Sequence, residues 1–224
     1  LLHFGGKVMK NVAGFDVARL LCGSLGILGP ITAVSLKVLP RPRAEATLRF
    51  AMSESEALAA FNRWAGQPLP VSASSWWQGE ARLRLSGAAA ALAAARSALG
   101  GEVLEEGAAA RWWQELRSLR HPMLGDAPAL WRLSLPSTAP PLALAAAPLI
   151  EWGGSLRWYA LELPAAEMRR IAAAAGGTAL HWRGGADGER FHPLAPAVLA
   201  IHRRLKERFD PHGVFNPSRL VAGL

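Results

Sequence analysis

Apolar and polar positions alternate along most of the 224 residues, at two different periods. Stretches that alternate every second residue and are rich in β-branched or aromatic side chains predict strands, whereas apolar positions three to four apart predict helices. Strands are expected at 1–4, 31–39, 46–52, 72–78, 81–87, 130–136, 155–163 and 178–184. Helices are expected at 17–22, 53–66, 87–99, 108–118, 164–177 and 196–210. Interspersed helices and strands indicate an α+β fold.

Local signals place the ends of several of these helices. Asp16 is expected to be the N-cap of the first helix, and Gly23 the residue that closes it. Ser53 and Glu56 have the spacing of a capping box at the start of the second helix. Ser86 is expected to cap the alanine-rich helix that follows.

The proline-rich stretch at 40–43 is the strongest candidate for a domain boundary. It predicts a segment 1–43, an α+β domain with an antiparallel sheet at 44–190, and a C-terminal helix and tail at 191–224. The nine tryptophans are many for this length, and we expect them in the core or at interfaces.

Composition argues against several classes of protein. The net charge of +8 comes mostly from arginines, but these are scattered and no basic block resembles a nucleic-acid-binding arm. No apolar run reaches the roughly 20 residues that a membrane-spanning helix needs. A single cysteine, Cys22, allows no intramolecular disulfide and no Cys-ligated zinc or iron–sulfur site, and it fits a reducing compartment.

Three glycines at intervals of three, Gly23, Gly26 and Gly29, form the most distinctive local pattern. A Rossmann fingerprint would need a strand before the glycines and a helix after them, and the expected order here is the reverse. A Walker A loop would need Gly-Lys-Ser/Thr before a helix, which is absent. Two interpretations are left: a loop whose backbone amides approach a pyrophosphate, or a tight helix-to-strand connection.

More than the glycines is patterned in this region. Residues 5–44 contain K-N-V-A-G-F-D followed by L-x-x-G-S-x-G-x-L-G-x-I-T, a strand and a proline-rich exit. This run resembles the end of the FAD-binding domain of the vanillyl-alcohol-oxidase/PCMH flavoprotein superfamily. Residues 209–220, FDPHGVFNPSRL, resemble the tail of FAD-linked oxidases. The stretches between them resemble the FAD-binding subunits of bacterial glycolate oxidases, so the resemblance covers essentially the whole chain.

The resemblance implies an FAD site and its residues. They match the superfamily's positions at Asn11, Gly14, Asp16, Gly23, Ser24, Gly26, Ile27, Gly29, Ile31, Thr32 and Asn216. Helix capping is an equal alternative role for Asp16, and a structural Asn-Pro turn is an alternative role for Asn216. The superfamily's earlier glycine-rich loop has no counterpart here. We therefore expect an N-terminally truncated chain that holds the end of the FAD domain, a cap domain and the tail.

The catalytic residues stay unassigned. Oxidation of a 2-hydroxy acid needs a base near the hydroxyl, a cation for the carboxylate and the flavin N5 as hydride acceptor. Catalytic relatives carry a compact His-rich motif, of which His181 and His192 are kept only at the edges of residues 181–193. A metal site from His181, Asp187 and His192 fits no standard ligand spacing, so no metal is predicted.

The resemblance implies a function within a complex. The expected function is that of an FAD-binding subunit of a glycolate oxidase, which oxidises glycolate to glyoxylate together with a paralogous flavoprotein subunit and an iron–sulfur subunit. A cytoplasmic location is expected, with peripheral membrane attachment only through the complex. The alternatives are a non-catalytic assembly subunit with a vestigial FAD site and, from charge alone, a nucleic-acid-binding protein.

Overall fold

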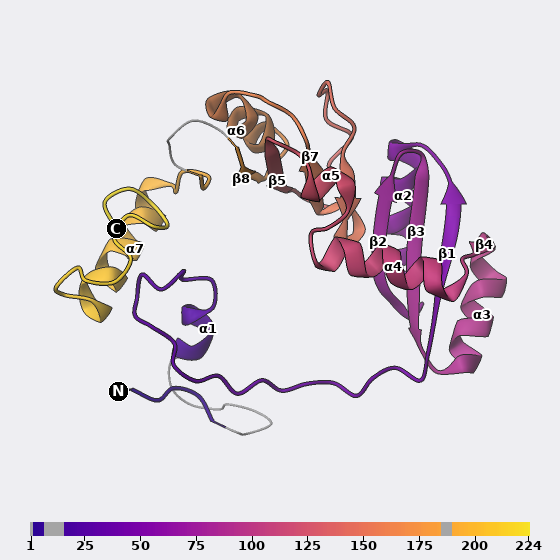
Figure 1. Ribbon diagram of the computed structural model, residues 1–224, viewed down its shortest axis with the longest axis horizontal. Helices are drawn as coiled ribbons and strands as arrows, with labels where there is room; N and C mark the ends of the chain where they lie inside the picture. The colour runs from indigo at the N-terminus through magenta and orange to yellow at the C-terminus, as the bar shows by residue number, and fades with distance from the viewer. Residues whose placement is uncertain (1, 7–15, 185–189) are drawn as a thin grey trace. The chain divides into compact units, whose positions relative to one another are not determined.

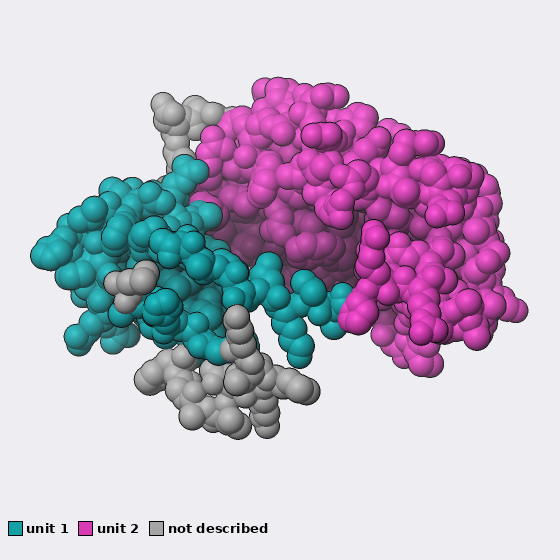
Figure 2. All heavy atoms as spheres, turned by 60° about the horizontal axis from the view of Figure 1, so that its bottom comes forward, with its two compact units in different colours: residues 1–39, 193–224 teal, residues 40–192 magenta. Residues whose placement is uncertain are grey.

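The computed structural model describes residues 2–6, 16–184 and 190–224. The chain forms two compact units (Figure 2). Unit 1 combines residues 1–39 with 193–224, and unit 2 comprises residues 40–192. Among the described residues, no helix combines the length and the apolar character that crossing a bilayer requires.

Unit 2 is built on an eight-stranded sheet in the order β4-β1-β3-β2-β6-β7-β5-β8 (Figure 1). All of its pairings are antiparallel, which confirms the expected α+β class with an antiparallel sheet. The first half is a βαββαβ unit: β1 (Ala44–Ala51), α2 (Glu54–Ala65), β2 (Val71–Trp77), β3 (Glu80–Gly87), α3 (Ala89–Leu99) and β4 (Glu102–Val103).

The second half repeats this topology with one change. It consists of β5 (Leu130–Ser134), β6 (Leu149–Glu151), the short η1 (Trp152–Gly154), β7 (Leu156–Tyr159), α6 (Ala165–Ala174) and β8 (Thr178–Arg183). Its order, β6-β7-β5-β8, is that of the first half read in reverse, so both halves have the split βαβ arrangement. Where the first half has α2, the second half has the loop 135–148. The halves join through β2 and β6, which share only two residue pairs.

Helices cover both faces of this sheet (Figure 1). One apolar cluster contains Leu48, Leu83 and Ile150 together with α2 and α3, and a second packs α6 against Trp131 and Tyr159. The connection between the halves carries α4 (Glu106–Arg117) and α5 (Pro122–Gly125), which pack on the opposite face. Most of the nine tryptophans lie in these clusters, as expected.

Helix ends follow the local signals with one exception. Asp16 caps α1 (Val17–Leu21) by accepting from the Arg19 amide at 3.0 Å, and Ser53 with Glu56 forms a complete capping box on α2. The prediction for Ser86 was wrong, because β3 extends to Gly87 and Ala88 is the N-cap of α3. The Ser86 hydroxyl instead donates to Glu45 on the neighbouring strand, at 2.8 Å.

Unit 1 contains α1, the glycine loop 23–29, an extended segment and α7 (Pro196–Phe209). The predicted strands at 1–4 and 31–39 were wrong for the described residues, since neither segment is part of a sheet. Val34, Leu36 and Val38 are 66%, 80% and 79% exposed, respectively. Alternation alone forms no strand when no neighbouring backbone accepts its hydrogen bonds.

Candidate functional site

The glycine loop consists of two consecutive tight turns. The Ile27 amide donates to the Ser24 carbonyl at 3.1 Å, and the Gly29 amide donates to the Gly26 carbonyl at 3.3 Å. Gly23, Gly26 and Gly29 all have positive φ, at 80°, 77° and 137°, which explains why glycine occupies these positions. Among the described residues, the amides of Gly23, Leu25, Gly26 and Leu28 find no hydrogen-bond acceptor.

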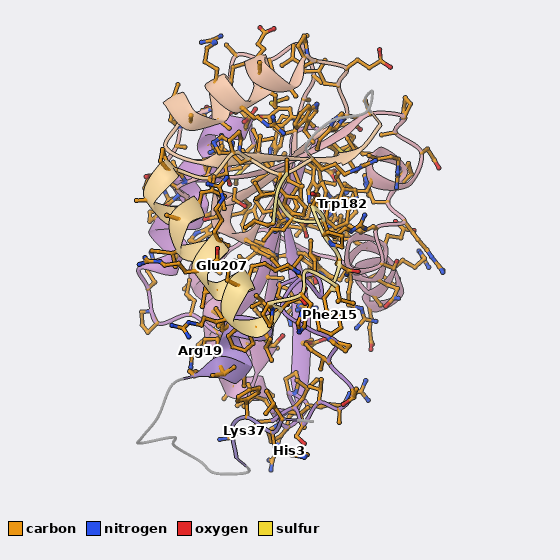
Figure 3. The ribbon with its side chains drawn as sticks, turned by 90° about the vertical axis from the view of Figure 1, so that its left-hand side faces the viewer. His3, Arg19, Lys37, Trp182, Glu207 and Phe215 are labelled. Carbon is orange, nitrogen blue, oxygen red and sulfur yellow. The ribbon has the colours of Figure 1, made fainter. Side chains whose placement is uncertain are left out.

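Helix α7 and the C-terminal tail hold the glycine loop by donating hydrogen bonds to two of the loop's carbonyls. The Lys206 ammonium, from the end of α7, donates to the Ile27 carbonyl at 2.8 Å and to the Phe215 carbonyl at 2.6 Å. The Asn216 side-chain amide donates to the Leu25 carbonyl at 2.6 Å. A Cβ on Gly26 would lie 2.8 Å from the Asn216 amide nitrogen, so this close approach also requires glycine. Figure 3 labels Glu207 on α7 and Phe215 in the tail.

Asp210 fixes the position of the Lys206 ammonium. Its carboxylate lies 2.5 Å from the Lys206 nitrogen and accepts from the amides of Val214 and Phe215, at 3.0 and 2.8 Å. Burial acts to raise the pKa of Asp210, but the hydrogen bonds from Lys206, Phe215 and Val214 outweigh it and lower the pKa to about 2. Asp210 is therefore ionised at neutral pH, and it joins α7, the tail and, through Lys206, the glycine loop.

This arrangement predicts an acid-labile contact between loop and tail. Because the folded pKa of Asp210 lies below the ordinary value of 3.8, the ion pair stabilises at pH values above that value. The contribution is lost as the pH falls through about 2. A carbon-detected NMR titration of the Asp210 carboxyl is expected to show this low midpoint, and Lys206→Met is expected to move it upward. A midpoint at the ordinary value in the unmodified protein would contradict the contact.

The structure brings only some of the predicted site residues together. Gly26, Ile27 and Asn216 meet at the loop–tail contact, and Ser24 is buried beside them in the loop. Gly23 and Gly29 lie at the two ends of the loop and Asp16 caps α1, while Ile31 and Thr32 are exposed in the extended segment. Asn11 and Gly14 lie outside the described residues.

Lys206 and Asp210 were missed in the sequence. Their spacing of four residues near the end of an amphipathic helix is typical of an exposed ion pair. The tail motif, which begins at Phe209, includes Asp210, but nothing local shows that the Lys206 ammonium reaches a carbonyl 179 positions away.

The two histidines of the His-rich stretch make contacts with other residues of unit 2. The His181 ring stacks on Trp131 with centroids 4.1 Å apart, and the His192 Nδ1 accepts from the Ala179 amide at 3.3 Å. Burial, followed by the charge of nearby arginines, lowers the pKa of both imidazoles. Among the described residues, no group of three or more His, Cys, Asp or Glu side chains is arranged to hold a metal, and Asp187 lies outside those residues.

Comparison with known proteins supports the resemblance drawn from the motifs. No family model matches the chain. It is 44% identical over 223 residues to the glycolate oxidase subunit GlcE of Escherichia coli K12, an alignment that covers all of this chain and 62% of GlcE. The chain is similar to GlcE along its whole length. A shorter match, 44% identical over 48 residues, links 21% of the chain to 10% of the glycolate oxidase subunit GlcD of Bacillus subtilis 168. The chain thus spans about three fifths of the length of GlcE.

Proposed function

We propose that the chain belongs to an FAD-binding subunit of a glycolate oxidase complex. The identity with GlcE over the whole chain and the partial identity with GlcD support this proposal. In the proposed complex, glycolate is oxidised to glyoxylate together with a paralogous flavoprotein subunit and an iron–sulfur subunit. Contact with the inner membrane, where it occurs, is made through the complex.

The glycine loop fits the diphosphate of FAD. A Cβ built on Gly23 or Gly29 meets no atom of the described residues within 4 Å, so these residues leave room for a ligand at both ends of the loop. The loop amides without an acceptor among the described residues are of the kind that binds phosphate oxygens in proteins. FAD, when bound, would supply the hydride acceptor for oxidation of the 2-hydroxy acid.

The observation that carries the proposal is the way the tail orients two of these amides. In a trans peptide the carbonyl and the following N–H point in opposite directions. Because Asn216 binds the Leu25 carbonyl, the Gly26 amide points away from Asn216. Because Lys206 binds the Ile27 carbonyl, the Leu28 amide likewise points away from Lys206. The tail thus preorganises two donors for an anion and takes up neither of them.

A second candidate function is that of an assembly subunit with a vestigial FAD site. The engagement of His181 with Trp131 and of His192 with a backbone amide favours it, because both contacts place these imidazoles in structural roles. The two candidates differ in whether the purified subunit carries flavin and in whether glycolate reduces that flavin.

A pair of glycine substitutions tests the cofactor role in the full-length subunit, expressed with its partners. Gly23 and Gly79 have nearly the same φ, 80° and 84°, and a Cβ on either meets no atom of the described part of the chain within 4 Å. Gly23→Ala and Gly79→Ala therefore carry the same backbone strain, but only Gly23 lies in the proposed site. Gly23→Ala is expected to weaken FAD binding about tenfold, the loss expected when one charge-assisted hydrogen bond is disturbed.

Flavin content per subunit, from absorbance after denaturation, and titration of the flavin-free protein with FAD measure the effect. Gly79→Ala is expected to retain the flavin content of the unmodified subunit. An equal loss in both variants, or no loss in Gly23→Ala, would show that the glycine loop does not bind the cofactor. A colourless subunit that still assembles would establish the assembly role in place of the FAD-binding one.

A further inference from the structure

A cavity of about 780 Å³ lies in unit 2, where the two halves of the sheet meet. Its volume is within the range of small-molecule sites. Tryptophans from several elements line it, among them Trp113 of α4, Trp152 of η1, Trp158 of β7 and Trp182 of β8, and Figure 3 labels Trp182. Arg84 and Arg132 also line it. None of these residues belongs to the glycine loop or to the proposed FAD site.

The cavity follows from the short junction between β2 and β6. The strands pair only at Ser75 and Trp76, and the chain then leaves β6 in the turn of η1. Ser74 accepts a hydrogen bond from the Gly153 amide at 2.7 Å and so holds this turn against β2. Trp152, at the start of η1, has a φ of 53° and is 66% exposed. A positive φ is strained for a bulky residue, and it persists only where the surrounding structure enforces that backbone conformation.

Guanidinium groups lie against the aromatic rings of this cavity. The central guanidinium carbon of Arg132 is 5.4 Å from the centre of the Trp152 ring and 5.8 Å from that of Trp158. Arg84 lies 5.4 Å from the centre of the Trp113 ring. The rings of Trp158 and Trp182 meet edge to face, with centroids 5.4 Å apart. At these distances, within the range of a cation–π interaction, the guanidiniums keep N–H donors from which an anion is able to accept.

The charges that line the cavity are unbalanced. Arg84, Arg117 and Arg132 all line it, and none forms an ion pair with a carboxylate of the described residues. Glu151 is the one acidic residue among the described lining residues, and it accepts a hydrogen bond from the Trp158 indole at 2.9 Å. Burial raises the pKa of Glu151, against the opposing effects of that hydrogen bond and of the Arg132 charge. Three cations thus face a single carboxylate that is already engaged.

We infer that this cavity binds a small planar anion, a conjugated ring system that carries an acidic group. The exposed tryptophans Trp152 and Trp182 provide stacking area for the ring, and the guanidinium of Arg132 provides donors for the anionic group. This binding site does not depend on the FAD role proposed for unit 1, because it uses no residue of that unit.

A pair of fluorescent probes tests the inference on the full-length subunit. 8-Anilinonaphthalene-1-sulfonate is a conjugated anion, and N-phenyl-1-naphthylamine is its neutral counterpart of nearly the same shape. Tryptophans are found only between residues 64 and 182. Energy transfer from tryptophan to a probe therefore reports on binding to unit 2 when the subunit residues outside this chain carry none, or when those tryptophans are replaced.

The anion is expected to bind at one site and more tightly than the neutral probe. Arg132→Gln is expected to weaken binding of the anion about tenfold, which is the loss of one charge-assisted hydrogen bond. The affinity for the neutral probe is expected to stay unchanged. Trp152→Ala is expected to weaken the binding of both probes. Arg96→Gln, at an exposed position of α3 that does not line the cavity, is the matched control and is expected to bind both probes normally.

Four results would overturn the inference. The first three are equal affinity for the two probes, an unchanged affinity for the anion in Arg132→Gln, and an equal loss in Arg132→Gln and Arg96→Gln. Binding of the anion at many sites of similar affinity would count in the same way, because it shows general adsorption to apolar surface. The far-ultraviolet circular dichroism of each variant establishes that the variants compared are folded.

Discussion

Arg157→Met is expected to lower the free energy of unfolding of unit 2 by about 3–5 kcal/mol, the cost of leaving several buried backbone carbonyls without their donor. Arg157 has no exposed surface, yet its guanidinium donates to three backbone carbonyls. These are Gly154 at 3.2 Å, Pro140 at 2.6 Å and Ala139. Two of them lie in the loop 135–148, so Arg157 ties this loop to β7. A methionine of similar length fills the space but leaves all three carbonyls without a donor.

The same substitution is expected to change the ionisation of a neighbouring acid. Burial raises the pKa of Glu54, and the charge of Arg157 opposes this rise. Without Arg157 the pKa of Glu54 is expected to rise further. The variant is therefore expected to lose additional stability as the pH increases, because the folded state then binds a proton more tightly than the unfolded state.

Guanidinium chloride titrations followed by tryptophan emission measure the loss in unit 2. Arg96→Met, an exposed arginine of α3, is the control and is expected to change the free energy of unfolding by less than about 0.5 kcal/mol. Arg157→Lys is expected to be intermediate, since an ammonium lacks the planar fork that reaches several carbonyls. An Arg157→Met variant as stable as the control would show that the loop is held by its apolar contacts alone.

Lys206→Met is expected to open the glycine loop. The Lys206 ammonium makes three hydrogen bonds, to the Ile27 carbonyl, the Phe215 carbonyl and the Asp210 carboxylate. Hydrogen exchange of the loop amides that close its turns, those of Ile27 and Gly29, is expected to accelerate about 100-fold, the effect of losing one or two charge-assisted hydrogen bonds. The proposed FAD role adds the expectation that flavin content falls in the full-length subunit, because the Leu28 amide is no longer oriented.

Arg203→Met provides the control, since Arg203 is exposed on the same helix and belongs to none of these contacts. Tryptophan emission is expected to show the same unfolding of unit 2 in both variants, because unit 1 contains no tryptophan. If exchange at Ile27 and Gly29 is equally slow in both variants, the tail does not hold the loop. If exchange accelerates while flavin content stays unchanged, the loop–tail contact is real but the cofactor proposal for it is wrong.

Local signals were sufficient for most elements of unit 2. The capping box at Ser53 and the apolar spacing after it define α2, and the alternation over 72–78 and 81–87 predicts the two strands observed as β2 and β3. β6 could not be predicted in this way. Its three residues follow an alanine-rich loop and form a strand only because β2 and β7 lie on either side of them.

The errors arise from long-range contacts. Residues 31–39 have the alternation of a strand, but a strand also needs a neighbouring segment to hydrogen-bond with. No described segment pairs with these residues. In the site, the motif identified Asn216 and the glycines, whereas Lys206 reads as an ordinary charge on an amphipathic helix. Its burial depends on the loop around Ile27, which approaches α7 only in the folded unit. Sequence alone therefore indicated the motif but not the contacts that hold it.

The two halves of unit 2 share one topology, but a helix in the first half is replaced by a loop at the equivalent position of the second. Beside the first half of the sheet stands α2, which buries Leu58, Phe61 and Trp64, and beside the second half stands the loop 135–148, which buries Leu135 and Ala139. A helix satisfies its carbonyls with its own amides, whereas this loop depends on the guanidinium of one residue for two of them. The two copies of one architecture therefore differ in their tolerance of substitution, because the α2 backbone holds itself and the loop backbone depends on Arg157.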